Sequence, residues 1–270
     1  MRRKKINRAN MIAACLVCAI YFSFLGNVKS YASEPVTANN TLVMERVAVS
    51  NAQQYQEQAQ RIYDRIKERI DGTEPYIETG IYVSKGEFDT LSYYTQIYFL
   101  GERPQLYYQE LAPDLYSILV GRNGLKEQLR QHEKALEQLK EIIKKADSLK
   151  TKDEKAVFYA KYLYGNYAYD YSYENKDVYK LLRDKKGICH TYATAYAWLC
   201  KLSDIPVIYM SGSLDGVPHA WDKVKRDGGD WKNIDVTNLH VSPDYTYVGD
   251  EFYRKRFAES NGYLVSRRYY

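Results

Sequence analysis

The sequence predicts a mixed fold of helices and antiparallel strands, the α+β class, and three observations lead to this prediction. The segment 188–202 is apolar, contains no helix breaker and is long enough for a buried helix. Two strand-like runs, 218–225 and 231–238, flank Arg226-Asp227-Gly228-Gly229, which is typical of a hairpin turn. The 270 residues are 45% hydrophobic and 27% charged, which fits a globular core and excludes collagen-like, low-complexity and wholly disordered classes.

Residues 1–32 have the pattern of a secretory signal peptide. Basic residues open the chain, Met11 to Leu25 form an uncharged apolar run of fifteen residues, and Ser30-Tyr31-Ala32 is a small-x-small ending. A spanning helix needs roughly 20 apolar residues, so an uncleaved membrane anchor is the less favoured alternative. We expect cleavage after Ala32 and a secreted or cell-surface protein without an integral membrane domain.

The charge balance changes once this predicted signal is set aside. The whole chain carries a net charge of +5, whereas the remainder has 33 basic and 34 acidic residues. The excess of positive charge therefore belongs to the export signal, and composition gives no support for a nucleic-acid partner.

The part before residue 150 is expected to be mainly helical. We interpret 33–50 as a polar linker and 51–149 as an N-terminal helical or α+β extension. Within the extension, apolar residues recur at three-to-four spacing over 51–70 and again over 125–149, which predicts two amphipathic helices. The intervening 76–120 mixes β-branched and aromatic residues with two prolines, which favours strands and turns.

The part from 150 to 270 is expected to form a second domain that carries the chemistry. It opens with a helix over 151–167, for which Thr151 and the acidic pair Asp153-Glu154 are suitable capping residues. Only Cys189 and Cys200 remain after the signal, and both fall in the predicted helix 188–202. Eleven residues of helix separate them by about 16 Å, beyond the ~7 Å reach of a disulfide, so both thiols should be free.

Three side chains in this domain could act together. Gly187 permits a close backbone approach just before the helix, and Cys189 falls in its first turn, where the helix dipole favours a thiolate. His219 and Asp235 lie on the two strands of the predicted hairpin. Cys200, three helical turns beyond Cys189, is best interpreted as a packing residue.

The hairpin register decides whether His219 and Asp235 share a face of the sheet. A three-residue loop with Gly228 in the left-handed conformation would place His219 directly opposite Asp235. A two-residue Asp227-Gly228 turn would instead pair His219 with Val236 and turn the carboxylate to the other face. We therefore expect a loop with an odd number of residues.

A thiol, an imidazole and a carboxylate supply the three roles of nucleophilic catalysis. Cys189 would attack an acyl carbonyl, His219 would protonate the leaving amine, and Asp235 would orient and stabilise the imidazolium. The product is a thioester, which water would hydrolyse and an amine would transamidate.

The order and spacing of these residues resemble the transglutaminase-like superfamily of papain-fold cysteine enzymes. The shared features are Gly-x-Cys opening an apolar helix, a strand that ends in Gly, His-Ala-Trp, and Trp-x-x-Ile-Asp-x-Thr. Cys189 and His219 are 30 residues apart and Asp235 follows 16 later, much closer than the 130 or more of papain-type proteases. Residues 150–238 carry this resemblance, and Arg103 to Tyr108 with Tyr169-Asp170 resemble exported bacterial members.

This resemblance implies an α+β domain in which the helix that carries Cys189 packs on an antiparallel sheet bearing His219 and Asp235. It implies an enzyme acting on amide bonds of proteins or cell-wall peptides, by transamidation or as a peptidase or amidase. Thiol chemistry needs no cofactor, and the sequence has no acidic loop typical of calcium sites.

Two alternatives stay open. The chain could be an inactive exported binding or adhesion module on the same fold, because some relatives have lost activity. A metal site is the other alternative for the Cys, His and Asp residues near the helix and hairpin, but none has the paired spacing of a zinc site. His190 points about 100° away from Cys189 on the helix, so it is interpreted as a core or surface residue and not as the base.

Overall fold

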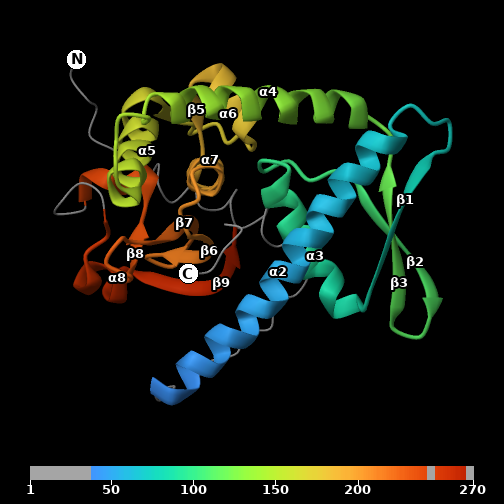
Figure 1. Cartoon of the computed structure of the whole chain (residues 1–270), viewed down its shortest axis with the longest axis horizontal. Helices are drawn as coiled ribbons and strands as arrows, with labels where there is room; N and C mark the ends of the chain where they lie inside the picture. The colour runs from blue at the N-terminus through green and yellow to red at the C-terminus, as the bar shows by residue number, and fades with distance from the viewer. Residues whose placement is uncertain (1–37, 242–246, 266–270) are drawn as a thin grey trace.

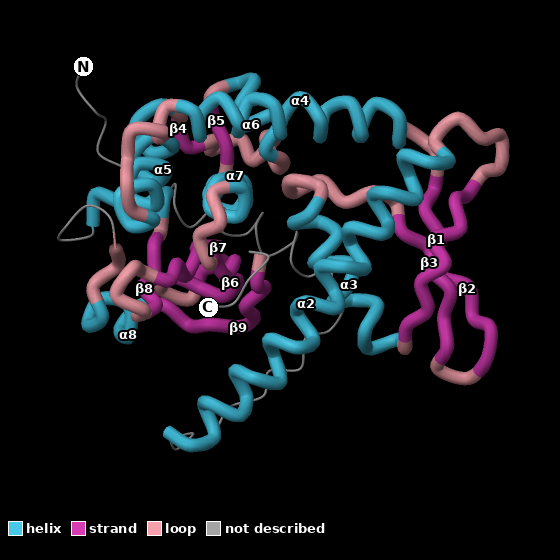
Figure 2. Tube along the Cα trace, in the orientation of Figure 1, coloured by secondary structure: helices cyan, strands magenta, loops and turns pink. Residues whose placement is uncertain are grey.

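The computed structural model describes residues 38–241 and 247–265, and over this range the chain is an α+β protein, as predicted (Figures 1 and 2). The predicted signal peptide 1–32 lies outside the described residues. The elements in chain order are α2 (Ala38–Arg69), β1 (Tyr76–Val83), α3 (Lys85–Tyr98), β2 (Leu106–Ala112), β3 (Leu115–Gly121), α4 (Leu125–Lys144), α5 (Lys152–Asn166), β4 (Ala168–Tyr169), α6 (Val178–Asp184), β5 (Lys186–Gly187), α7 (Cys189–Leu202), β6 (Val207–Leu214), β7 (Val217–Lys225), β8 (Trp231–Ile234), the 3-10 helix η1 (Val236–Val241), α8 (Asp250–Arg256) and β9 (Phe257–Leu264).

The N-terminal lobe consists of α2, α3 and a small antiparallel sheet with strand order β1-β3-β2. In β1 every second side chain is buried, so one face of the sheet contributes to a core and the other faces solvent. The core of this lobe contains Ile62 and Ile66 from α2, Ile77 from β1 and Ile118 from β3. The apolar surface that these side chains bury between helix and sheet holds α2 against the sheet.

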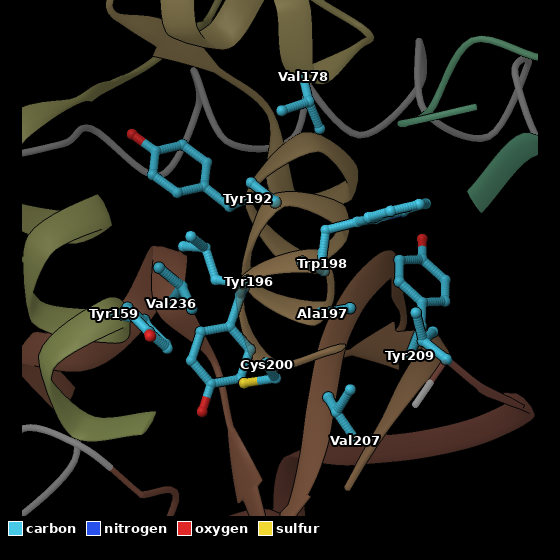
Figure 3. Packing of buried hydrophobic residues seen from close by; sticks show 14 of the residues in the cluster. Tyr159, Val178, Tyr192, Tyr196, Ala197, Trp198, Cys200, Val207, Tyr209 and Val236 are labelled. Atoms are coloured by element: carbon cyan, nitrogen blue, oxygen red, sulfur yellow. The ribbon is translucent and has the colours of Figure 1, made fainter. Parts of the chain in front are cut away.

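The C-terminal lobe consists of a four-stranded antiparallel sheet, order β8-β7-β6-β9, with α7 packed on one face. All of α7 from Cys189 to Cys200 is buried, as expected for an apolar helix without a polar face. Figure 3 shows α7 in this core, with Tyr196, Trp198 and Cys200 on the helix and Tyr209 on the sheet. Burial of large aromatic side chains from both elements holds the helix on the sheet.

Helix α4 joins the two lobes. It crosses from one to the other in Figure 1, and at about 1.5 Å per residue its twenty residues span roughly 30 Å. Leu125 and Leu129 at its start belong to the N-terminal core, whereas Leu139 and Ile142 belong to the C-terminal core. Both lobes are therefore packed on one rigid element, and the division between 51–149 and 150–270 stays a prediction.

Two expectations for the N-terminal lobe need correction. Helix α2 begins at Ala38, inside the segment 33–50 that we expected to be a linker, because no Gly or Pro interrupts the chain between Pro35 and Gly72. Within 76–120, residues Lys85–Tyr98 form helix α3 in place of strands and turns. The Ser84 hydroxyl accepts a hydrogen bond from the Glu87 N–H, and the Glu87 carboxylate accepts one from the Ser84 N–H.

The remaining helices agree with the expected pattern. Helix α5 covers Lys152–Asn166, and Thr151 with Glu154 forms the predicted capping box at its start. His132 of α4 is buried, and its ring packs against the rings of Tyr63 and Trp198. Helix α4 therefore turns His132 toward the lobe interior, where its ring packs as an aromatic side chain.

Among the described residues, tyrosines lie both in the core and on the surface. Tyr159, Tyr196 and Tyr209 are fully buried in the C-terminal core, whereas Tyr82 and Tyr108 are more than half exposed on the small sheet.

Within the described residues, no helix has both the length and the apolar character that crossing a bilayer requires.

Candidate active site

Cys189 is the first residue of α7, and its position depends on the strand pair just before it. Strand β5 pairs in parallel with β4, with Gly187 opposite Tyr169. A Cβ atom at Gly187 would collide with the Thr191 hydroxyl and with Leu181. The close approach predicted for Gly187 is thus confirmed, and a larger residue would push the start of α7 away.

The first turn of α7 is closed by Thr191. Its hydroxyl accepts a hydrogen bond from the N–H of Ile188 at 2.9 Å and lies 2.8 Å from the Ile188 carbonyl oxygen, to which it donates. Cys189 is only 4% exposed, which disfavours a charged sulfur, but it lies at the positive end of the helix dipole. The helix dipole favours a thiolate over a thiol.

The hairpin of β7 and β8 brings His219 to Asp235, but in a register that differs from the expected one. The strands pair Lys223 with Asn233 and Lys225 with Trp231, so the loop has five residues instead of three. Its left-handed glycine is Gly229, not Gly228. The number of loop residues is odd, as expected, which keeps both side chains on one face of the sheet.

The five-residue loop has a tertiary cause. The Arg226 guanidinium binds the Asp153 carboxylate at 3.0 Å, and the Asp227 carboxylate accepts the N–H of Asp153 at 3.1 Å. Both contacts anchor the loop on the first turn of α5. In the resulting register Asp235 lies diagonal to His219, just beyond the end of β8.

His219 and Asp235 form a buried pair. Nε2 of His219 lies 2.8 Å from Oδ2 of Asp235, and the two residues are 8% and 2% exposed. The same carboxylate accepts hydrogen bonds from the Thr237 N–H and hydroxyl and from the Asn238 amide, at 2.7 to 3.2 Å. Because several donors satisfy it, the carboxylate is held ionised and in one orientation.

Cys189 joins this pair from the helix side. Its side chain is hydrogen-bonded to His219 and to the backbone N–H of Ala220. Burial raises the pKa of the Cys189 thiol, but the hydrogen bond and charge of His219 and the Ala220 N–H outweigh it and bring that pKa below its ordinary value. The structure thus brings together all three of the predicted residues.

The pKa of His219 moves in the opposite direction. Burial alone would lower it, but the Asp235 carboxylate and the Cys189 sulfur raise it to about 10. The pKa of Asp235 is lowered, since His219, Asn238 and Thr237 together outweigh its burial. At neutral pH this electrostatic balance favours a thiolate beside an imidazolium, the reactive state of a cysteine nucleophile.

Aromatic side chains cover the His219 ring. Trp221 stacks near it with ring centroids 6.3 Å apart, and Phe257 from β9 packs edge-on against both rings. The Trp221 indole N–H donates to the Asn233 side-chain oxygen at 3.1 Å, which fixes the ring. This cover keeps water from the His219–Asp235 hydrogen bond and so strengthens it.

Cys200 and His190 take no part in this cluster. Cys200 is fully buried beside Tyr196, as predicted, and Cys189 and Cys200 are both free thiols. His190 is buried with Nδ1 2.8 Å from the Tyr209 hydroxyl, which agrees with its interpretation as a core residue. Among the described residues, no group of three or more His, Cys, Asp or Glu side chains has the arrangement of a metal site.

Sequence reasoning missed several groups that support the three side chains. Thr237 and Asn238 lie two and three residues after Asp235, and this spacing after an Asp is a signal for side-chain capping that could have found them. The Ala220 N–H and the Phe257 ring leave no such signal. Their roles follow from the strand pairing alone.

Comparison with known families agrees with this geometry. Residues 138–236 match the family model of the transglutaminase-like superfamily. This part of the chain is similar to the transglutaminase-like superfamily. The transglutaminase-like segment begins within α4 and ends one residue after Asp235, so it contains Cys189 and His219. No curated protein matches the chain.

Similarity to solved structures is remote. A TGase crystal structure is 14% identical, with a TM-score of 0.35, and the match covers 62% of this chain and 51% of that one. A proposed cysteine protease from Cytophaga hutchinsonii is 15% identical over 49% of this chain and 50% of its own, with a TM-score of 0.34. The periplasmic domain of TgpA from Pseudomonas aeruginosa, bound to ethylmercury, is 18% identical over 50% and 61%, with a TM-score of 0.30. The chain thus spans about half the length of the solved structures that it matches.

Proposed function

We propose that the protein is an exported cysteine enzyme that acts on amide bonds of proteins or cell-wall peptides. The observation that carries this proposal is the buried chain of hydrogen bonds from Cys189 through His219 to Asp235. Export is supported by the signal pattern of residues 1–32. The family match supports cysteine chemistry but leaves the substrate open.

The proposed reaction begins with attack of the Cys189 thiolate on the amide carbon. Nε2 of His219 faces Asp235, so the other ring nitrogen, Nδ1, faces the sulfur and carries the proton to be transferred. As the C–N bond breaks, this proton passes to the leaving amine and a thioester remains on Cys189. Asp235 holds the ring in place and balances the charge of its protonated form.

The second half of the proposed reaction regenerates the thiolate. Water or a primary amine attacks the thioester carbon, and neutral His219 accepts a proton from that nucleophile. The C–S bond breaks and releases an acid or a new amide. We assign the Cys189 backbone N–H to the oxyanion, because N–H groups in the first turn of a helix have no partner within the helix.

The direct test offers an amide substrate together with two acceptors. The purified protein is incubated with benzyloxycarbonyl-Gln-Gly, or with cell-wall peptides, in water alone and with hydroxylamine, and products are identified by mass spectrometry. We expect release of ammonia or of a peptide amine, and an acyl group on Cys189 in quenched samples. The ratio of hydroxamate to free acid then separates transamidation from hydrolysis.

The matched control is Cys189→Ala, which keeps the helix start and removes the sulfur. It is expected to lower turnover to the background rate and to leave no acyl group on the chain. If neither protein gives product with either class of amide, the chain is the inactive binding module that the sequence left open.

A further inference from the structure

The N-terminal lobe contacts the start of α7 through His190, the neighbour of Cys189. His190 is 6% exposed, and its ring is bonded on one side to the C-terminal lobe and on the other to the N-terminal lobe. Nδ1 lies 2.8 Å from the Tyr209 hydroxyl of β6, and Nε2 lies 3.3 Å from the amide nitrogen of Gln96 in α3. The ring is therefore fixed between two elements that are distant in the sequence.

Gln96 and Gly101 both lie against Nε2 of His190. The Gln96 amide nitrogen donates to the Gly101 carbonyl oxygen at 3.1 Å, and Nε2 of His190 lies 3.3 Å from that nitrogen and 3.5 Å from that oxygen. In a neutral ring one nitrogen donates and the other accepts, and both ring nitrogens of His190 have a partner here. Burial lowers the pKa of His190 to about 4, so the ring is neutral near pH 7, as this pattern requires.

The backbone of the turn at Leu100 and Gly101 lies in close contact with His190. Leu100 and Gly101 both have positive φ, 58° and 98°, a conformation that is unfavourable for a buried leucine. The Leu100 carbonyl accepts the N–H of Val178 at 2.9 Å, which ties the turn to the start of α6. A Cβ at Gly101 would come within 3.1 Å of Nε2 of His190 and 3.2 Å of the Lys176 carbonyl oxygen.

A second bond between the same elements lies further along α7. The indole N–H of Trp198 donates to the carbonyl of Ile97 at 2.7 Å. Trp198 follows His190 by eight residues, or about 12 Å along the helix. The end of α3 and the turn after it thus hold α7 at two points, one of which adjoins Cys189.

We propose that Gln96, Gly101 and His190 are positioning residues for Cys189, through which the N-terminal lobe sets the direction of the sulfur toward His219. This inference rests on the proposed function and gives the N-terminal extension a part in it. The thiolate is stabilised by a hydrogen bond, and a hydrogen bond weakens steeply when its geometry changes. A small displacement of the first turn of α7 therefore reduces the reactivity of Cys189.

The test compares two glycine variants of the N-terminal lobe. Gly101→Ala adds a methyl group against His190, whereas Gly124→Ala adds one at a similar positive φ of 69° with no atom within 4 Å. The rate of alkylation of Cys189 by iodoacetamide is followed by peptide mass spectrometry from pH 5 to 10. We expect Gly101→Ala to slow alkylation at pH 6 at least tenfold and to raise the apparent pKa of the thiol, and Gly124→Ala to match the parent protein.

Two further variants separate positioning from a loss of stability. Gln96→Met keeps the side-chain length but removes both N–H groups, and it should shift the alkylation profile in the same direction as Gly101→Ala. Ile62→Ala weakens the core of the N-terminal lobe away from α7 and should lower the melting temperature without shifting the profile.

The outcomes distinguish the inference from the proposed function. If Cys189 of the parent protein alkylates like an ordinary thiol, the proposed function and this inference both fail. If the parent protein reacts at low pH and both Gly101→Ala and Gln96→Met match it, the positioning role is wrong and the proposed function stands.

Discussion

Asp235→Ala is expected to lower kcat/KM for amide substrates by two to four orders of magnitude. Burial lowers the pKa of His219, and Asp235 together with Cys189 raises it to about 10, so removal of Asp235 would bring that pKa back toward its ordinary value. The imidazolium would then be rare at pH 7 to 8, so Cys189 would lose the positive charge that stabilises its thiolate. The measurement is steady-state kinetics with any substrate found in the amide assay.

Asp235→Asn is the matched control for this prediction. Its side-chain oxygen can still accept a hydrogen bond from Nε2 of His219, so it should retain more activity than alanine. A value of kcat/KM for Asp235→Ala within threefold of the parent, in a folded protein, would show that Asp235 has no part in the reaction.

Asp222→Asn is expected to change how stability depends on pH. Asp222 lies on β7 between Tyr209 and Ile234, is fully buried, and has no hydrogen-bond partner for either carboxylate oxygen among the described residues. Burial, aided by the charge of Asp235, raises the pKa of Asp222 well above its ordinary value. The folded protein therefore holds this side chain as a neutral acid.

The sign of the effect follows from proton binding. Above the ordinary pKa of about 3.9, the unfolded chain has released this proton and the folded chain keeps it, so stability falls as pH rises. Asparagine has no proton to lose. Relative to the parent, Asp222→Asn should therefore gain about 1.4 kcal/mol of unfolding free energy for each pH unit, a tenfold change in the folding equilibrium.

Urea unfolding at pH 5, 6 and 7 measures this difference, and a constant offset from the substitution itself does not affect the slope. A gain of at least tenfold in the folding equilibrium between pH 5 and 7 agrees with a neutral Asp222. An equal difference at all three pH values would mean that Asp222 is ionised in the folded protein.

The sequence was sufficient for the parts of the site that local pattern controls. The apolar run after Gly187 predicts α7 and places Cys189 in its first turn, as the structure has it. Alternation along a strand predicts that His219 shares a face with Asp235 whenever the loop is odd. The three residues that meet in the structure are those predicted, and their part in a reaction stays a proposal.

Long-range contacts account for what the sequence did not predict. The loop of the hairpin is two residues longer than expected because Arg226 and Asp227 bind Asp153, a contact across more than seventy residues. The contact between Gln96 and His190 spans 94 residues and leaves no local signal. Helix α3 is rich in aromatic and β-branched residues, so its composition favoured strands, although the capping pattern at Ser84 and Glu87 was legible.

The central claim is that Cys189 and His219 form a thiolate–imidazolium pair, and alkylation of Cys189 against pH measures it most directly. The pKa of Cys189 is lowered and that of His219 is raised to about 10, so the pair should exist at neutral pH and persist up to about pH 10. We expect rapid labelling by iodoacetamide that persists well below pH 8.5, where a free thiol is mostly protonated. In His219→Ala, labelling should be slow until the pH exceeds the pKa of an ordinary thiol, about 8.5. Slow labelling with the same ordinary profile in both proteins would contradict the ion pair and the enzyme built on it.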